Sequence, residues 1–250
     1  MAFRIRTLLP EDPPDSFPDP AKAGVALGYP DGLLAIGGDL SPPRLLAAYR
    51  RGIFPWYNDD QPVLWWSPDP RAVILPSGFH MSRSTTRMIR RGGWQYSLNK
   101  AFHDVISGCA RNRGRHGTWI TPEMQAAYQE MHAFGYAHSV ESWFNGALAG
   151  GIYGIRLGGV FFGESMFSLA TGGSKIALSG LIAECLAEDI AMLDCQLPSD
   201  HLRTLGMVEM ARDSFLAYLH ENTRAARPRR DWRFEPKPAE PLISLRMQAG

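Results

Sequence analysis

Two acids and an amide near the middle of the chain have the types and spacing of a reactive site. Glu164 lies in Gly163-Glu164-Ser165-Met166-Phe167, and the other two lie in Asp194-Cys195-Gln196. An amphipathic segment over 174–193 separates the blocks, so we expect them at the edges of one strand–helix–strand unit. Buried carboxylates either do chemistry, hold a cation, or form structural caps and internal ion pairs. The residue types alone leave these alternatives open.

No motif for a metal, a nucleotide or a covalent nucleophile accompanies these residues. The seven histidines show no H-E-x-x-H spacing, and the three cysteines form no C-x-x-C pair. Gly172-Gly173-Ser174-Lys175 is not a phosphate-binding loop, and the serine after Glu164 lacks the following glycine of a nucleophile elbow. We therefore expect no metal and no cofactor, and a site built from carboxylates, an amide and aromatic side chains.

The charges are unevenly distributed although the formal net charge is only +1. The stretch from Arg83 to Arg115 holds eight Arg or Lys and one acid, a balance of 8 − 1 = +7. Helical spacing puts four arginines on one face, and two more follow in a glycine-containing loop: Arg83, Arg87, Arg90, Arg91, then Arg113 and Arg115. Such a cluster indicates a polyanionic partner or a solvated face.

The order of the expected elements predicts an α+β fold. Hydrophobic periodicity, caps and the Asn145-Gly146 hairpin signal favour helices over 42–51, 82–91, 100–109, 122–134, 174–191 and 213–220, and strands over 32–40, 72–75, 94–98, 138–144, 147–155, 159–162 and 192–196. A meander followed by a helix and a strand is typical of a mixed, mainly antiparallel sheet with flanking helices.

The proline-rich stretch around residue 70 suggests a boundary between two domains. We expect a small N-terminal α/β domain over 1–70, a catalytic domain over 71–236, and a disordered tail over 237–250. Proline and acid in the first 30 residues exclude a secretory signal, and no apolar run reaches the roughly 20 residues that span a bilayer. With its unpaired cysteines, the chain is expected to be cytoplasmic, without a membrane partner, and monomeric.

Several unusual blocks resemble the leucyl/phenylalanyl-tRNA–protein transferase family over about residues 30–220. They are Gly32–Leu40, Gly52–Trp56, Leu64–Val73, Gly117–Thr121, His138–Glu141, Gly150–Gly154, Gly163–Ser168, Ser174-Lys175, Asp194–Gln196, Asp200-His201 and Leu205-Gly206. The resemblance implies an acetyltransferase-like (GNAT-like) catalytic domain. It also implies transfer of Leu, Phe or to some extent Met from aminoacyl-tRNA to the N-terminal Arg or Lys of proteins, which marks them for N-end-rule degradation.

The resemblance implies roles for the acid–amide group. Gln196 would orient the attacking α-amine, and Asp194 would accept its proton directly or by relay. Glu164 would assist, or would pair with the cationic side chain of the acceptor. The division of these roles between the two acids is left open.

The resemblance also implies the residues that bind the donor. Trp56 and Trp119 correspond to aromatics around the 3′ adenosine and the aminoacyl group, whereas Trp65 and Trp66 are expected in the core. Ile152, Leu178 and Leu181 would line an apolar aminoacyl pocket, with Cys185 deeper. The arginines of 83–91, with Arg113 and Arg115, would contact the tRNA backbone without reading its sequence.

Two other functions would use parts of the same sequence pattern. An acyl-CoA-dependent N-acetyltransferase on the same fold would need a Q/R-x-x-G-x-G/A loop, which Arg156-Leu157-Gly158-Gly159 does not supply. A non-catalytic RNA-binding module would need only the basic face, and the presence of Asp194-Cys195-Gln196 argues against it.

Overall fold

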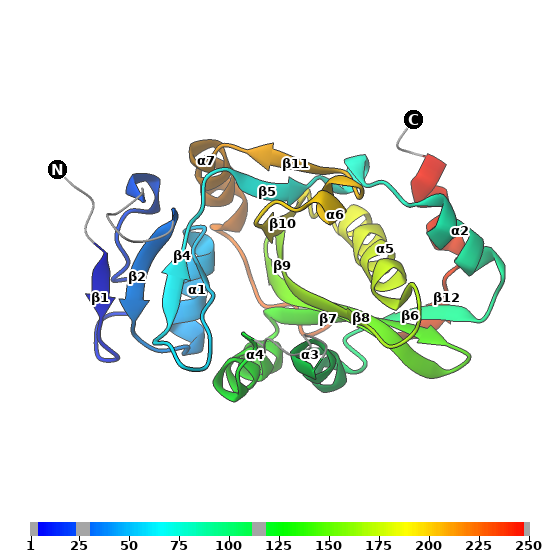
Figure 1. Ribbon diagram of the computed structural model, residues 1–250, viewed down its shortest axis with the longest axis horizontal. Coiled ribbons are helices and arrows are strands. Elements are labelled where there is room, and N and C mark those ends of the chain that lie inside the picture. The colour runs from blue at the N-terminus through cyan, green and yellow to red at the C-terminus, as the bar shows by residue number, and fades with distance from the viewer. Residues whose placement is uncertain (1–4, 24–30, 112–118, 248–250) are drawn as a thin grey trace.

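The structure is a computed structural model that describes residues 5–23, 31–111 and 119–247. Its strands form two sheets, a four-stranded one in the N-terminal part and a strongly curved eight-stranded one in the rest of the chain (Figure 1). Arg113 and Arg115, which were predicted to contact tRNA, lie outside the described residues.

The four-stranded sheet has the order β1-β2-β4-β3. Its strands are β1 (Arg6–Leu8), β2 (Leu33–Gly37), β3 (Phe54–Pro55) and β4 (Leu64–Trp66). Helix α1 (Pro42–Arg50) follows β2, and the short η1 (Pro20–Lys22) precedes it. Ser41 does not cap α1 with its side chain. Instead, the Asp39 carboxylate accepts from Ser41 N at 2.8 Å and from Arg44 Nε at 2.9 Å.

The eight-stranded sheet has the order β11-β5-β10-β9-β8-β7-β6-β12. Its strands are β5 (Arg71–Ile74), β6 (Trp94–Leu98), β7 (Ala137–Phe144), β8 (Ala147–Leu157), β9 (Val160–Ser168), β10 (Met192–Gln196), β11 (Met207–Met210) and β12 (Phe234–Pro238). Only β9 and β10 pair in parallel, and the other neighbours are antiparallel. The mixed, mainly antiparallel α+β architecture expected from the sequence is confirmed.

Helices cover both faces of this sheet (Figure 1). Helix α5 (Gly173–Ala187) crosses from β9 to β10 on one face, and α3 (Phe102–Arg111) and α4 (Pro122–Phe134) pack on the other. Helix α4 has the caps that the sequence predicts, because Thr121 Oγ1 accepts from Met124 N and Gly135 is left-handed with φ 85°. The remaining helical segments are α2 (Arg83–Arg90), α6 (Asp200–Arg203), α7 (Arg212–Thr223), η2 (Pro76–Gly78) and η4 (Glu240–Met247).

The two sheets share a hydrophobic core. One cluster of buried side chains joins Tyr49, Phe54 and Trp65 of the N-terminal part to Tyr128 on α4 and Phe162 on β9. The chain passes from the last strand of one sheet to the first strand of the other between residues 66 and 71. The N-terminal part is therefore packed against the large sheet, and this contact brings Tyr49 of α1 to Phe162 and Glu164 in the middle of β9.

Two segments differ from the sequence expectation. Strand β9 runs to Ser168 instead of ending near 162, so Glu164 lies within a strand. The expected disordered tail after residue 236 instead continues β12 and forms η4. Strand β12 pairs with β6, and Ala239, Leu242 and Leu245 are buried. Their burial in the core around α5 and α2 stabilises a segment whose sequence has no strong periodicity.

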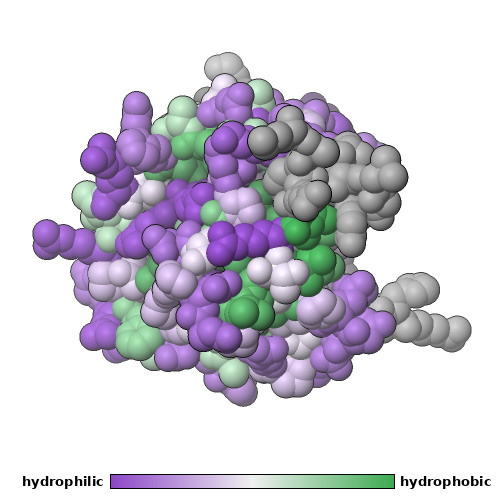
Figure 2. Space-filling model, turned by 90° about the vertical axis from the view of Figure 1, so that its left-hand side faces the viewer, coloured by the Kyte–Doolittle hydropathy of each residue, from purple (hydrophilic) through white to green (hydrophobic). Residues whose placement is uncertain are grey.

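No helix among the described residues is long and apolar enough to cross a membrane. On the side of the molecule that carries the four-stranded sheet, apolar side chains form small patches interrupted by hydrophilic ones (Figure 2).

Candidate active site

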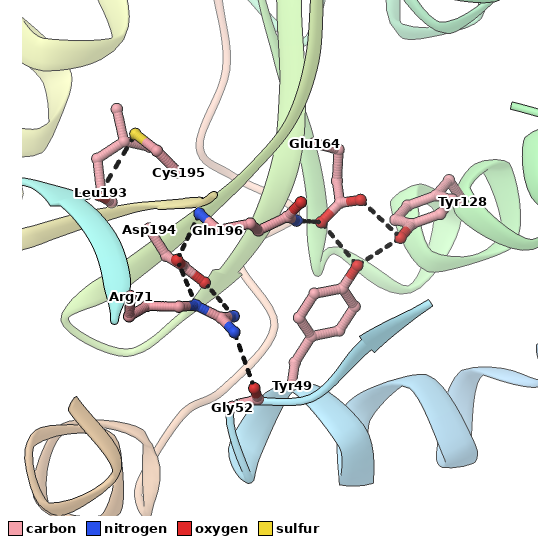
Figure 3. A network of polar contacts seen from close by, with 9 residues as sticks. All are labelled: Tyr49, Gly52, Arg71, Tyr128, Glu164, Leu193, Asp194, Cys195 and Gln196. Carbon is pink, nitrogen blue, oxygen red and sulfur yellow. Dashed lines mark hydrogen bonds and ion pairs between the residues drawn. The ribbon is translucent and has the colours of Figure 1, made fainter. Parts of the chain in front are cut away.

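The β9–α5–β10 unit brings the acid–amide group together as the sequence predicts. Gln196, at the end of β10, donates from Nε2 to Glu164 Oε1 on β9 at 2.9 Å (Figure 3). This bond directs the Nε2 side of the Gln196 amide toward the carboxylate. The Oε1 atom of Gln196 is thereby left as the acceptor on the other side of the amide.

Glu164 is held by two buried tyrosines. Tyr49 from α1 donates to Oε1 at 2.7 Å and Tyr128 from α4 donates to Oε2 at 3.0 Å, and the two hydroxyls also contact each other (Figure 3). Burial raises the pKa of Glu164 from 4.5 to about 7, against the lowering effect of the tyrosine hydrogen bonds; the Asp194 charge also raises it and Arg71 lowers it. A carboxyl group with this pKa exchanges a proton readily near neutral pH.

Asp194 faces a buried arginine instead of the cavity. Its carboxylate accepts from Arg71 Nε at 2.8 Å and from Nη2 at 2.7 Å, and its Oδ1 also accepts from Gln196 N at 2.9 Å. Its side chain is 0% exposed. With both oxygens engaged, this carboxylate has no open path to an incoming amine, which argues against the expected role of Asp194 as the direct proton acceptor.

Gln196 has a strained backbone. Its φ is 66°, in the left-handed region that glutamine rarely adopts, and the β10–β5 pairing shifts register between Asp194 and Gln196. Such a conformation costs about 1–3 kcal/mol and persists only where neighbouring contacts enforce it. The bond from Gln196 N to the Asp194 carboxylate is one of these contacts.

A mainly apolar cavity of about 340 Å³ lies next to Glu164. Ile152 and Leu178, two of the predicted pocket residues, line it, whereas Leu181 is fully buried and does not line it. Its other lining residues come from β5, β9, β10 and the start of α6: Ile74, Gly163, Ser165, Met166, Leu193, Cys195, Ser199, His201 and Leu202. Glu164 is the single acid among these lining residues. Cys185, predicted deeper, is also fully buried.

The predicted aromatic residues lie in different surroundings. Trp56 is 41% exposed and lines a second cavity of about 440 Å³ together with Trp66, whose ring centroid is 5.8 Å away. Trp65 is fully buried, as expected for a core residue, and donates to Gly37 O at 2.8 Å. Trp119 is 8% exposed and belongs to the shared core. The structure therefore does not bring Trp56 and Trp119 into the cavity beside Glu164.

The predicted basic face is present on α2. Arg83, Arg87, Arg90 and Arg91 are all exposed, and none forms an ion pair with another residue in the described part of the chain. Their charge is therefore available to an external polyanion.

Three residues of the network were missed by the sequence reasoning. Tyr49 and Tyr128 lie in two of the helices that the sequence predicts, and a buried tyrosine hydroxyl needs a polar partner, which is a usable signal. Arg71 directly precedes a run of buried apolar residues, and a charge at such a position also requires a partner. The identity of those partners depends on contacts between segments that are remote in sequence. Among the described residues, no group of three or more His, Cys, Asp or Glu could hold a metal ion.

Sequence comparison places the chain in a family. The sequence model of leucyl/phenylalanyl-tRNA protein transferases matches residues 73–220, and the model of the N-terminal domain of these enzymes matches residues 38–69. The chain belongs to the leucyl/phenylalanyl-tRNA protein transferase family. It is therefore an aminoacyltransferase, as the sequence resemblance implied.

Curated members of the leucyl/phenylalanyl-tRNA protein transferase family align over most of both chains. The enzyme of Photobacterium profundum is 50% identical over 219 residues, which are 87% of this chain and 91% of that one. The enzyme of Aromatoleum aromaticum is 54% identical over 203 residues, 81% of this chain and 86% of that one. Among solved structures, L-PGS from Bacillus licheniformis aligns with a TM-score of 0.40 and 11% identity over 69% of this chain and 57% of that chain, too remote to carry an argument.

Proposed function

We propose that the chain joins leucine or phenylalanine from aminoacyl-tRNA to the N-terminal arginine or lysine of a protein, at the cavity beside Glu164 and Gln196. This is the reaction of the family to which the chain belongs, and the product is marked for N-end-rule degradation. The observation that supports this location is the Gln196–Glu164 pair at the wall of an apolar cavity. Met is a further donor that the same cavity would accept.

The reaction forms one bond and breaks another. The amine nitrogen attacks the ester carbonyl carbon of the aminoacyl-tRNA, and the ester C–O bond to the terminal ribose breaks. The amine loses a proton, and the ribose oxygen gains one as it leaves. Because the ester is already activated, the protein has only to place the reactants and handle this proton.

Gln196 orients the amine and Glu164 takes the proton in this proposal. Three oxygen–oxygen contacts join Glu164, Tyr49 and Tyr128, but the two hydroxyls supply only two protons when Glu164 is ionised. When Glu164 accepts a proton, there are three protons for the three oxygen–oxygen contacts, so each contact becomes a hydrogen bond. The group is thus one proton short before the reaction, and the proton can pass from Glu164 to the ribose oxygen.

The apolar cavity holds the donor side chain. Ile152 and Leu178 line it, and Leu181 supports it from α5 without reaching its surface. In a site that discriminates by apolar contacts, one methylene group is worth only about 1–3 kcal/mol, so acceptance of several apolar amino acids is expected. The pKa of about 7 for Glu164 also makes the carboxylate available to a cationic acceptor side chain when it is ionised.

The tRNA is held by aromatic and basic residues. Trp56, which is exposed beside a cavity, stacks on the 3′ adenosine, and Trp119 supports this region from the core. The exposed arginines of α2 contact the phosphate backbone, and we propose the same partner for Arg113 and Arg115, which lie outside the described residues.

The remaining features of the proposal concern architecture. The large sheet is GNAT-like, since α5 joins its one parallel strand pair, β9 and β10. Residues 1–70 form a small N-terminal domain and residues 71–236 the catalytic domain. The chain acts as a cytoplasmic monomer without a membrane partner, for which the small, interrupted apolar patches in Figure 2 are favourable.

A transfer assay tests this proposal. Charged tRNA carrying radiolabelled leucine is mixed with an acceptor protein that begins with Arg, and label in the protein is measured. We expect the label to appear with the wild type, to be lost with Gln196→Ala, and to remain with Gln129→Ala, a half-buried glutamine on α4 away from the cavity. An acceptor with a blocked N-terminus must stay unlabelled. Transfer that survives Gln196→Ala and Asp194→Ala together refutes the proposed site.

A further inference from the structure

Arg71 is immobilised at the junction of the two sheets. Its side chain is 1% exposed, and its planar fork donates to both oxygens of Asp194 at 2.8 and 2.7 Å (Figure 3). The remaining Nη1 donates to Gly52 O at 3.1 Å. The rings of Phe54 and Phe215 lie 4.8 and 4.6 Å from the centre of the guanidinium group. Three hydrogen bonds and two aromatic contacts thus fix the orientation of this group.

Stability alone does not account for such a pair. A buried ion pair contributes little net stability relative to apolar residues of similar volume, because both charges lose their hydration. In some proteins such buried groups are retained because they fix a geometry. The contacts of Asp194 identify what is fixed.

Asp194, which Arg71 holds in place, in turn holds the backbone of Gln196. Its Oδ1 accepts both from Arg71 Nε and from Gln196 N, at 2.8 and 2.9 Å. The second bond ends on the backbone amide of the left-handed residue itself, and the direction of the Gln196 side chain toward Glu164 depends on that backbone conformation. If the Asp194 carboxylate could rotate, it would not hold the backbone of Gln196 in this conformation. The bidentate contact with Arg71 prevents this rotation.

Arg71 also contacts the segment that leads to Trp56. Gly52 and Phe54 belong to the chain immediately before that tryptophan, and Phe54 lies in β3. One guanidinium group therefore touches both the N-terminal segment and the strand that carries Gln196.

We propose that Arg71 is a positioning residue of the transfer reaction, which holds the Gln196 amide in its working orientation through Asp194. This inference rests on the proposed function, because it takes Gln196 as the residue that orients the amine. It assigns Asp194 a geometric role in place of proton acceptance.

Single-turnover transfer rates at saturating acceptor test the proposal. Arg71→Lys keeps the charge but cannot make the bidentate contact, so we expect the rate per folded protein to fall about tenfold or more. The affinity for charged tRNA should stay at the wild-type value, because the basic face lies on α2. Arg44→Lys is the matched control, since Arg44 is equally buried and bonded to Asp39 at 2.9 Å. A wild-type rate in Arg71→Lys overturns the proposal.

The pH profile separates a loss of positioning from a change of charge near Glu164. The rate should rise with pH as Glu164 ionises. Since Arg71 lowers the pKa of Glu164 and Asp194 raises it, this rise should move to higher pH in Arg71→Met, to lower pH in Asp194→Asn, and not at all in Arg71→Lys. Disappearance of the rise in Asp194→Asn identifies Asp194 as the proton acceptor and overturns the proposal.

A milder variant covers the case in which the charge variants do not fold. Phe215→Leu keeps both charges and removes one ring from the guanidinium group, and it should lower the single-turnover rate without moving the pH profile. An unchanged rate contradicts the proposal. The proposed function is tested separately: if Gln196→Ala abolishes transfer while Arg71→Lys does not affect it, only the positioning role of Arg71 fails.

Discussion

Replacing Glu164 with glutamine should remove a pH dependence from the stability of the fold. The pKa of this carboxyl is 4.5 in its ordinary state and about 7 when buried here. The folded protein therefore binds the proton more tightly than the unfolded chain does. The stability from Glu164 is fully present below pH 4.5 and is lost as the pH rises through about 7. At about 1.4 kcal/mol per pH unit, the loss is about 3 kcal/mol.

Urea unfolding at 25 °C between pH 4.5 and 8.5 measures this loss as the difference in unfolding free energy between wild type and Glu164→Gln. The difference should move by about 3 kcal/mol in favour of the variant across this range. Glu221→Gln is the control, because Glu221 is exposed on α7 and its carboxylate is in water in both states. A difference that stays constant with pH refutes the raised pKa of Glu164, and with it the role of Glu164 as a proton acceptor near neutral pH.

Two further predictions concern substrate binding. Arg87→Gln with Arg90→Gln should weaken tRNA binding and reduce the slope of log affinity against log salt by about 2, whereas Arg6→Gln, at the opposite end of the molecule (Figure 1), should leave the slope unchanged. An unchanged slope in the double variant would remove α2 from the tRNA interface. Leu178→Ala enlarges the apolar cavity and should raise the ratio of phenylalanine to leucine transfer, measured as kcat/KM, by about tenfold. Leu186→Ala, exposed on the same helix, should not change this ratio, and equal ratios in both variants would exclude Leu178 from donor recognition.

Local signals predicted much of the fold. The Asn145-Gly146 turn has both residues at positive φ, as a tight hairpin requires, and Thr121 and Gly135 bound α4 as their types indicate. The parallel pairing of β9 and β10 follows from the helix between them. These features depend on residues that are close in sequence, so a single sequence contains the information.

The missed features depend on contacts between remote segments. Tyr49 and Glu164 are 115 positions apart, and Arg71 and Asp194 are 123 apart. Periodicity identifies a buried side of α1 but not the carboxylate that its tyrosine meets. In the same way, the spacing of Asp194 and Gln196 shows two polar groups near a strand end, but it does not show that one of them faces a buried arginine. The role that the resemblance implies for Asp194 therefore depends on its contact with Arg71, which the sequence alone does not reveal.

Helix α1 contributes Tyr49 to the group that holds Glu164, so the small N-terminal part supports the proposed reaction site from behind the surface of the cavity. An engineer who exchanged this part between relatives would also exchange a component of the proposed acid–base group. The exchanged part would need a tyrosine at the position of Tyr49, and core residues that place α1 at the same distance from β9. Substitutions near position 49 would then change the proton affinity of Glu164, a carboxyl group far along the chain.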